Sequence, residues 1–433
     1  MRLAPTARPP IASRVLGLLL AWLSIARLPT ALAEGSEAST DPPSFVIGSK
    51  GFGYESRDGA SSFYTHWLVA ADLQSFLSTK PPGVVSRGGF VVKSAGLQLD
   101  AVLHRVIHSQ LFVDFAQSKA TLFDAWIQVQ PRPWLAVRVG KFQFPINEER
   151  LTSPLALPFV STSFASVLLP SRDIGVHVLG SVLDGRLRYN LALTDGAVAG
   201  TLIETELDSS KDVVARVFGK PLARSRWAAV RELGIGIGAS VGKHRGTAAN
   251  PNLPTLRSYG GQTFFAYRNT GMPSSTSVAD GVVARVVPHA TWSWGPVAAY
   301  ADYVHVSERV AGTTIESDGW SVIPSLVLTG EAASPLRFIV PKRPFDLARG
   351  QLGTVMITAG VGSIHVSSSA FTRAADPELA MQRATVIGGG VNWYPFAGIA
   401  LLADYGYMRF TPFASAPTRP SEHTVIVRFQ LAL

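Results

Sequence analysis

The carboxyl-terminal segment, residues 424–433, carries an apolar side chain at every second position up to its last residue. Because successive side chains of an extended strand point to opposite faces, this spacing predicts a β-strand with one fully apolar face. That face consists of Val425, Val427, Phe429, Leu431 and Leu433. Arg428 and Gln430 lie on the other face. A strand of this kind must press its apolar face against an apolar partner, and we expect that partner to be lipid.

The beginning of the chain has the features of a secretory signal peptide. An apolar run at 15–25 follows three arginines and is too short to span a bilayer as a helix. Small residues at 31–33 supply a cleavage site, so we expect residues 1–33 to be removed and the protein to be exported. A transmembrane anchor is the alternative interpretation of this run.

Charge and composition exclude several classes of protein. The formal net charge is +9, but the predicted signal peptide holds four arginines and no acid, which leaves +5 for the remainder. These scattered cations do not form the basic patch of a nucleic-acid binder. The chain has no cysteine, which excludes disulfides, thiolate metal sites and cysteine nucleophiles. Hydrophobic residues make up 47%, yet no stretch after residue 33 approaches the ~20 apolar residues of a membrane helix.

The apolar residues are instead distributed over 16 to 18 short segments with a period of two, as half-buried strands require. The clearest are 63–77, 90–99, 107–117, 122–130, 134–142, 173–182, 186–194, 212–220, 232–241, 260–267, 282–294, 297–306, 319–328, 355–366, 385–393, 399–410 and 424–433, with 45–55 as a weaker candidate. Tight turn signals such as 183–185 alternate with longer polar intervals such as 270–279 and 331–351. This alternation predicts an up-and-down arrangement.

An exported β chain with apolar outer faces is expected to close into a barrel, since only a closed sheet pairs every backbone group in lipid. The chain after the signal peptide allows about 25 residues for each of 16 strands, which suits an outer-membrane barrel. The sequence therefore predicts an all-β transmembrane antiparallel barrel of 16 strands, with 18 as the alternative. We assign residues 34–62 to a periplasmic lead-in segment and 63–433 to the barrel.

Alternation along the predicted strands also identifies residues that face the lumen. In 186–194 the apolar residues point to lipid, which turns Arg186 and Arg188 inward. In 134–142 the same argument turns Arg138 inward, and Arg428 of the last strand shares this orientation. These positions are basic more often than acidic, so we expect a hydrated lumen lined by cations. The alternative interpretation places such residues at the barrel rim, where they contact lipid headgroups and need not select a solute.

Several stretches resemble the phosphate-selective porin O and P family of Gram-negative outer membranes. They are 138–142 (RVGKF) with Pro145 and 149–151 (ERL), 172–176 (RDIGV), 279–281 (ADG) with Arg285 and Pro288, 328–331 (LTGE), Pro341 with 344–346 (PFD), and 392–394 (NWY). The resemblance is collinear over nearly the whole chain after the signal peptide. It implies a 16-stranded barrel, commonly a homotrimer, whose loops fold into the channel and whose basic residues conduct anions such as phosphate.

The resemblance carries over to individual residues at five positions, namely Arg138, Lys141, Arg150, Arg172 and Arg285. The chain departs from the family pattern at 87–93 (RGGFVVK), where family members often have several arginines. Glu148 and Glu149, next to Arg150, also weaken the local positive field. With Arg186, Arg188 and Arg428, these are the predicted pore-lining residues. Outer-membrane lipid, lipopolysaccharide and small anions are the expected partners.

The interval 143–171 is unusually long and apolar for a loop. One interpretation places it inside the barrel as a constriction, and the other at the surface or in a subunit contact. Fixed cations at such a constriction would favour anions. The aromatic residues near strand ends are expected at the membrane interfaces: Trp134, Trp292, Trp294, Trp393, Tyr394, Tyr405 and Tyr407.

Enzymatic and metal sites find no support in the sequence. His104 and His108 would lie ~13 Å apart on a strand, too far to share one ion. Gly234, Gly236 and Gly238 alternate with isoleucines as the small inward face of a strand rather than as a phosphate-binding loop. We therefore expect no catalytic residue, metal or cofactor. A non-selective porin, a structural or adhesive outer-membrane barrel, and an exported enzyme or soluble β protein remain as alternatives.

Overall fold

The computed structural model describes residues 44–48, 51–77, 88–116, 120–200, 210–414 and 418–433. The predicted signal peptide lies outside these residues. The strands are β1 (Ser44–Gly48), β2 (Gly51–Glu55), β3 (Ser62–Phe76), β4 (Gly89–Leu103), β5 (Ile107–Asp114), β6 (Thr121–Arg132), β7 (Leu135–Gln143), β8 (Arg172–Val182), β9 (Leu187–Thr194), β10 (Asp212–Gly219), β11 (Gly234–Arg245), β12 (Leu256–Arg257), β13 (Thr263–Phe265), β14 (Ala279–Trp294), β15 (Val297–Val310), β16 (Thr313–Val327), β17 (Thr354–Val366), β18 (Arg383–Phe396), β19 (Ile399–Thr411) and β20 (Glu422–Ala432). The short helices are η3 (Pro154–Ala156), η4 (Ala165–Leu168), η5 (Ala228–Val230) and α2 (Ala370–Arg373).

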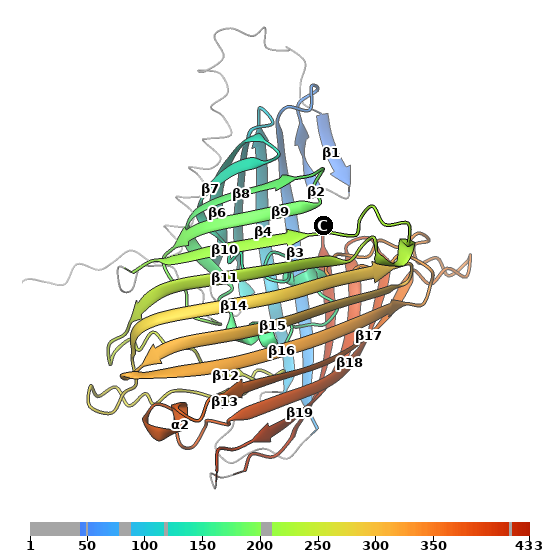
Figure 1. The fold of residues 1–433 in the computed structure, drawn as a ribbon. Coiled ribbons are helices and arrows are strands. Elements are labelled where there is room, and N and C mark those ends of the chain that lie inside the picture. The colour runs from blue at the N-terminus through green and yellow to red at the C-terminus, as the bar shows by residue number, and fades with distance from the viewer. Residues whose placement is uncertain (1–43, 49–50, 78–87, 117–119, 201–209, 415–417) are drawn as a thin grey trace, which may run out of the picture.

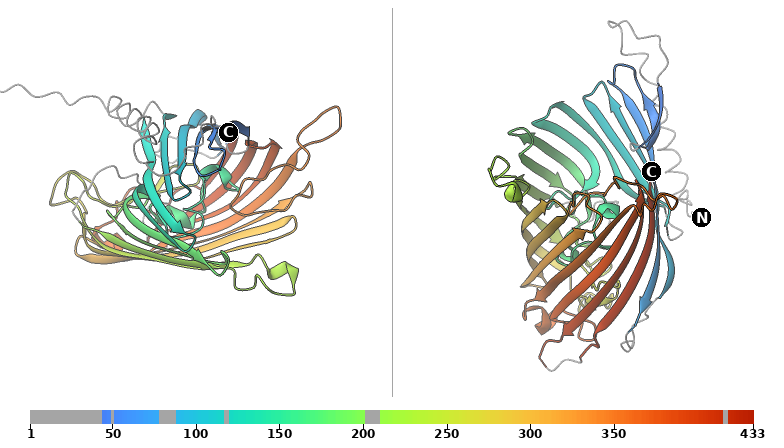
Figure 2. Two further views of the ribbon diagram at one scale, coloured as in Figure 1. Left: turned by 90° about the horizontal axis from the view of Figure 1, so that it is seen from above. Right: turned by 90° about the vertical axis from the view of Figure 1, so that its right-hand side faces the viewer.

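Sixteen of these strands, β3–β11 and β14–β20, form one closed barrel (Figure 1). Each strand pairs antiparallel with the next one along the chain, and β20 pairs with β3 to close the circle. Figure 2 shows the strands tilted around a common axis. Closure gives the barrel's backbone groups a partner on both sides of each strand, which is what a sheet in lipid requires. The prediction of a 16-stranded up-and-down barrel is confirmed.

The hairpin β1–β2 extends the sheet beyond the closed part of the barrel. β2 pairs with the first residues of β3, from Phe52↔Thr65 to Glu55↔Ser62. β20 occupies the same edge of β3 further along, and Leu433 exchanges backbone hydrogen bonds with Trp67 where it ends. The weak sequence signal at 45–55 therefore corresponds to two short strands, which project from one end of the barrel (Figure 1).

The connections differ between the two ends of the barrel, which we call the turn end and the loop end. Short turns such as 295–296 and 397–398 lie at the turn end, and long segments such as 144–171 and 246–278 lie at the loop end. The expectation that 331–351 belongs with the long loops is wrong, because 328–353 connects β16 to β17 at the turn end. The reason is a two-residue turn at the loop end, where Ala311 and Gly312 both have positive φ and join β15 directly to β16.

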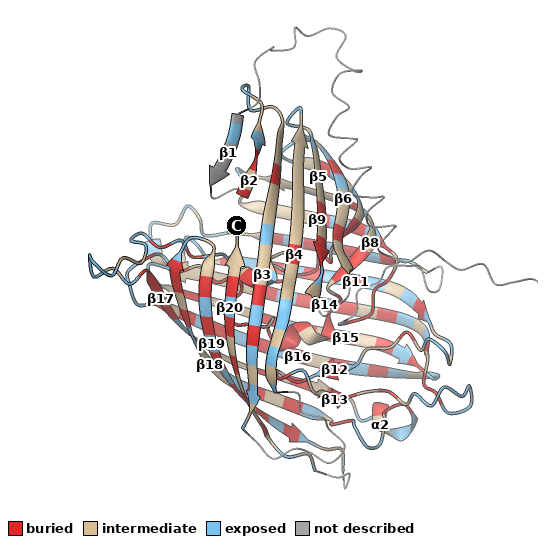
Figure 3. Cartoon of the chain, turned by 180° about the vertical axis from the view of Figure 1, so that it is seen from behind, coloured by how far each residue is buried: buried red, intermediate tan, exposed pale blue. Residues whose placement is uncertain are grey.

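Burial alternates along the strands as the sequence predicts (Figure 3). In β9, Leu191 and Leu193 are about half exposed on the outer face, whereas Asn190 and Thr194 are buried on the inner face. The same alternation places Phe429 outside and Arg428 inside. In the part of the chain that the structure describes, no helix has the length and apolar character needed to cross a membrane.

Exposed tryptophans gather on the outer face at the turn end. Trp67, Trp134 and Trp294 are each more than half exposed there. Their position agrees with the expected interface belt. The prediction that Tyr394 lies at the membrane interface is wrong, because it is buried on the inner face and packs in the core beside Met356. Its neighbour Trp393 takes the outer face instead.

Packed apolar side chains fill part of the lumen, so the lumen is not lined by cations throughout. Two loop-end segments, 144–171 and 246–278, fold inward and bury apolar side chains such as Phe164 and Phe264 against the inner faces of β14–β19. The interpretation of 143–171 as an internal loop is therefore correct. The segment 260–267, predicted to be a barrel strand, lies within the second inward loop, where Thr263–Phe265 pairs with β12.

Glycines on the inner faces of the strands make room for the two loops. A Cβ atom at Gly238 would lie 1.9 Å from the carbonyl oxygen of Ile146 in the first loop. At Gly406 it would lie 2.7 Å from the ring of Tyr259 in the second loop. The prediction that Gly234, Gly236 and Gly238 form a small inward face is confirmed. The first loop lies against Gly238, whereas side chains of neighbouring strands cover Gly234 and Gly236.

Candidate functional site

A cavity of about 400 Å³ remains between the wall formed by β5–β10 and the first inward loop. Its lining is mostly polar and comes from six adjacent strands as well as from Leu151 of the loop. The lining residues are Gln110, Asp124, Trp126, Gln130, Ala136, Arg138, Gln143, Leu151, His177, Leu179, Gly180, Ser181, Arg188, Tyr189, Asn190 and Arg216. Three arginines thus face one cavity.

Arg138 on β7 is held flat against the cavity wall. Its guanidinium carbon lies 3.9 Å from the ring centroid of Trp126. Its Nε and Nη2 atoms donate to Oε1 of Gln128 at 3.0 and 2.8 Å. Stacking and a neutral hydrogen-bond acceptor fix the orientation of the cation without neutralising it. The positive charge of Arg138 is therefore available to the cavity.

Arg188 and Arg216 share the carboxylate of Glu148. Arg188 donates from Nη2 to Oε2 of Glu148 at 2.9 Å, and Arg216 forms an ion pair with Oε1 of the same carboxylate. Arg216 is almost completely buried, whereas the Arg188 side chain is 43% exposed. One acid therefore balances two cations, and this group retains a positive charge. Glu148 also attaches the first loop to the barrel wall.

Arg216 is not among the residues predicted from the sequence, although the alternation of apolar and polar residues in β10 indicates its inward orientation. In β10 the exposed residues Val213 and Val217 occupy the outer face. Val214, Arg216 and Phe218 consequently point inward, where all three are buried.

Arg172 lies next to the cavity in a neutral pair. Its Nε and Nη2 atoms donate to the Asp124 carboxylate at 3.1 Å, and both side chains are buried. The pair screens the cavity from the one acid of its lining, Asp124. The structure therefore places Arg172 as the partner of Asp124 and not as a free cation.

Arg150 stabilises the first inward loop from within. Its Nη2 atom donates to the carbonyl oxygens of Ser166 and Leu169, the second at 3.0 Å. Burial lowers the pKa of the Arg150 guanidinium, and the neighbouring Glu149 counteracts this shift. Arg150 is absent from the cavity lining. Lys141 is also buried, but it pairs in register with Ala125 and Ile174, so it lies on the face opposite to Arg138.

The three remaining predicted residues lie away from the cavity. Arg285 donates to Asp212 at 3.1 Å, and Asp212 also contacts His244 at 3.0 Å. Arg428 donates to Asp72 of β3 through two bonds of 2.7 and 2.8 Å. Arg186 lies in a turn at the turn end, where it pairs with Asp184 at 3.3 Å. Of the eight predicted residues, the structure brings Arg138 and Arg188 together.

Side chains of the opposite wall hold the first loop across the lumen. Asn392 donates to the carbonyl oxygen of Pro158, and Gln430 donates to that of Leu155, each at 2.7 Å. The backbone amide of Val160 donates to Asp404 at 2.7 Å. These contacts come from β18, β19 and β20, on the far side of the barrel from the cavity. They fix the position of the loop that forms the inner boundary of the cavity.

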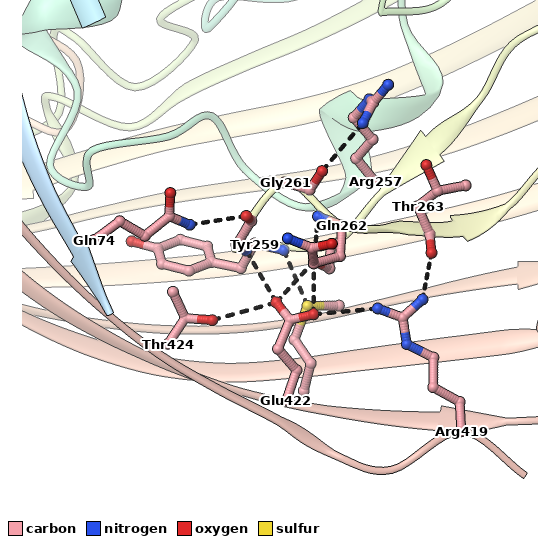
Figure 4. A network of polar contacts seen from close by, with 12 residues as sticks. Gln74, Arg257, Tyr259, Gly261, Gln262, Thr263, Arg419, Glu422 and Thr424 are labelled. Atoms are coloured by element: carbon pink, nitrogen blue, oxygen red, sulfur yellow. Dashed lines mark hydrogen bonds and ion pairs between the residues drawn. The ribbon is translucent and has the colours of Figure 1, made fainter. Parts of the chain in front are cut away.

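The second loop is held by a polar network around Glu422 (Figure 4). Ser258 and the backbone amide of Gly260 donate to the Glu422 carboxylate, and Arg419 pairs with it at 3.3 Å. Gln74 of β3 donates to the carbonyl oxygen of Gly260 at 2.8 Å (Figure 4). Within the described residues, no group of three or more histidines and acids is arranged to hold a metal ion.

Solved outer-membrane proteins share this fold at low sequence identity. OmpT of Vibrio cholerae, in a trimer form, matches with a TM-score of 0.55 and 10% identity over 86% of this chain and 100% of its own. The outer-membrane channel DcaP of Acinetobacter baumannii matches with a TM-score of 0.54 and 11% identity, over 88% of this chain and 99% of its own. An anion-selective porin from Comamonas acidovorans matches with a TM-score of 0.52 and 10% identity, over 86% of this chain and 100% of its own. No protein-family model and no curated protein sequence matches the chain.

Proposed function

We propose that the protein is an outer-membrane porin through which small anions diffuse along the basic cavity. The observation that carries the proposal is the convergence of Arg138, Arg188 and Arg216 on one cavity whose acid, Asp124, is neutralised by Arg172. Fixed cations at a narrow passage replace part of an anion's hydration shell and repel cations. The proposal includes a cleaved signal peptide and an outer-membrane location.

Phosphate is the specific solute that the family resemblance suggests. Arginine forks match phosphate oxygens well, which favours this solute chemically. Glu148 opposes it, because it neutralises one of the two cations beside it. We therefore propose small anions as the solute class and phosphate as one member of it. A homotrimer fits the proposal, since a similar solved structure is described as a trimer form.

Reversal potentials in planar bilayers test the proposal. In a potassium chloride gradient the wild-type protein is expected to favour chloride. The double variant Arg138→Gln with Arg188→Gln should lower the anion-to-cation permeability ratio roughly fivefold for each cation removed, since one charge at contact distance in water contributes about 1 kcal/mol. The matched control is Arg224→Gln with Arg343→Gln, two exposed arginines of the turn-end segments 220–233 and 328–353. An unchanged reversal potential in the double variant would refute the proposed role.

A barrel with a structural role and no transport is the second candidate, and the packed lumen favours it. The apolar core between the two inward loops and β14–β19 fills part of the lumen. Single-channel recording distinguishes the two candidates. A porin gives discrete conductance steps that saturate with anion concentration, whereas a structural barrel gives none.

A further inference from the structure

We infer that the outer face of β17–β20 binds an anionic lipid, one whose headgroup ends in a phosphate monoester, near the loop end of the barrel. The inference concerns the outside of the wall and is independent of the proposed passage through it. It rests on a pair of arginines, on the hydroxyl groups beside them and on the apolar surface below them.

Arg383 and Arg409 are neighbours on the outer face. Arg383 of β18 pairs in register with Thr411 of β19, and Thr385 pairs with Arg409. The two arginines are therefore diagonal neighbours on adjacent antiparallel strands, which places their Cβ atoms roughly 7–8 Å apart. Both are exposed, whereas Ala384 and Phe410 beside them are buried on the inner face. Two long cationic side chains can thus converge on one ligand.

Within the described chain, neither arginine has an ion pair or a side-chain hydrogen bond. The outward positions of β17–β20 contain no acid; Asp404 and Glu422 of these strands are buried on the inner face. The next strand, β16, carries two outward acids. Asp318 already accepts from Tyr303 and His305, and Glu316 is separated from Arg383 by the whole of β17. Elsewhere at the loop end, Arg309 lies 3.9 Å from Asp280. The Arg383–Arg409 pair therefore differs from Arg309 in having no ion-pair partner among the residues that the structure describes.

Polar hydrogen-bond donors surround the pair. Thr411 pairs in register with Arg383, and Thr385 pairs with Arg409. The next outward pair toward the middle of the barrel is Ile387 with Tyr407. His423 of β20 lies opposite Tyr407, with the ring centroids 4.8 Å apart. Arginine forks and hydroxyl donors together are the groups that phosphate oxygens bind best.

An apolar surface continues from the pair toward the turn end. Ile387, Val391 and Leu401 are exposed there at 57%, 50% and 38%, and Phe429 of β20 adjoins Leu401 in register. Acyl chains can cover this surface while the headgroup reaches the arginines. A free anion would use the arginines alone. Cations directly above an apolar band thus identify the ligand as a lipid rather than a soluble phosphate.

Native mass spectrometry of the full chain in detergent tests the inference. Phosphatidic acid and phosphatidylcholine are added in equal amounts, and the retained lipid is counted. The wild-type protein is expected to retain phosphatidic acid preferentially. The variant Arg383→Gln with Arg409→Gln should lose roughly thirtyfold in affinity, as expected for two basic residues at an anionic lipid surface.

The matched control is Arg257→Gln with Arg309→Gln, which removes the same charge elsewhere and should retain the lipid. Equal loss in both double variants would overturn the inference, because retention would then follow net charge alone. Equal retention of the two lipids by the wild type would overturn it as well. Inorganic phosphate at the concentration of the lipid should not displace phosphatidic acid, and full displacement would contradict a lipid site. An unchanged reversal potential of the Arg383→Gln, Arg409→Gln variant confirms that the barrel is intact.

Discussion

The charge of single residues decides what the cavity can attract. Glu148 sets this charge, since its carboxylate balances either Arg188 or Arg216 but not both. Replacing Glu148 by Gln keeps the shape and the hydrogen-bonding capacity of the side chain and removes the negative charge. We expect the anion-to-cation permeability ratio to rise roughly fivefold, because one elementary charge at contact distance in water is worth about 1 kcal/mol.

Reversal potentials in a salt gradient measure this effect, and Glu378→Gln serves as the control. Glu378 is an exposed acid of the segment 367–382 and is absent from the cavity lining. A lower anion-to-cation permeability ratio in the Glu148→Gln variant would contradict the prediction. It would show that Glu148 acts mainly by positioning the arginines and not by neutralising their charge.

Individual residues also show what the sequence could reveal. Alternation identified Arg138 and Arg188 because orientation within a strand depends on local spacing alone. The neutral state of Arg172, Arg285 and Arg428 was not predictable, since their acids lie on other strands and meet them only through the register and the closure of the barrel. The inward orientation of a cation can therefore be predicted from the sequence, whereas the presence or absence of its ion-pair partner cannot.

At the scale of elements, one acid joins the two inward loops. Asp404 of β19 accepts from the backbone amide of Val160 in the first loop and from the Tyr259 hydroxyl in the second, at 2.7 and 2.8 Å. Burial raises the pKa of the Tyr259 hydroxyl well above its usual range, and the charge of Asp404 raises it further, so Tyr259 remains a donor. Asp404→Ala should free both loops, because each hydrogen bond to a charged group contributes about 1.5–3 kcal/mol.

The expected result of Asp404→Ala is a larger and noisier single-channel conductance. Tyr259→Phe removes only the second-loop contact and should give an intermediate value. If Asp404→Ala conducts like the wild type, the packed segments do not limit the passage.

The inner glycines lead to a second prediction at this scale. A Cβ atom at Gly238 would meet the backbone of Ile146 at 1.9 Å, so Gly238→Ala must displace the first loop. We expect a loss of about 1–3 kcal/mol in the free energy of unfolding, as for other overpacked sites. Urea unfolding of the protein in lipid vesicles measures it. Gly389→Ala is the matched control, since the nearest atom there is 3.6 Å away. Equal stability of the two variants would mean that the loop is free to shift.

The whole molecule depends on a closure that joins the two ends of the barrel sequence. Arg428 of β20 and Asp72 of β3 form a buried ion pair across this seam. Strand periodicity and length predicted the closed barrel, whereas the inward folding of 246–278 left no comparable signal. The segment 263–265 of this loop has the pattern of a strand, and only the space inside the barrel decides that Phe264 and Phe265 pack there.

The pair across the seam yields the last prediction. Arg428→Met leaves Asp72 buried without its cation, which should cost about 3–5 kcal/mol in the free energy of unfolding. Adding Asp72→Leu removes the remaining charge and should restore most of the loss, because a buried ion pair is often no more stable than an apolar pair of similar size. Urea unfolding in vesicles measures both variants. If the double variant is as unstable as Arg428→Met, the hydrogen-bonding geometry of the pair, and not its charge balance, maintains the seam.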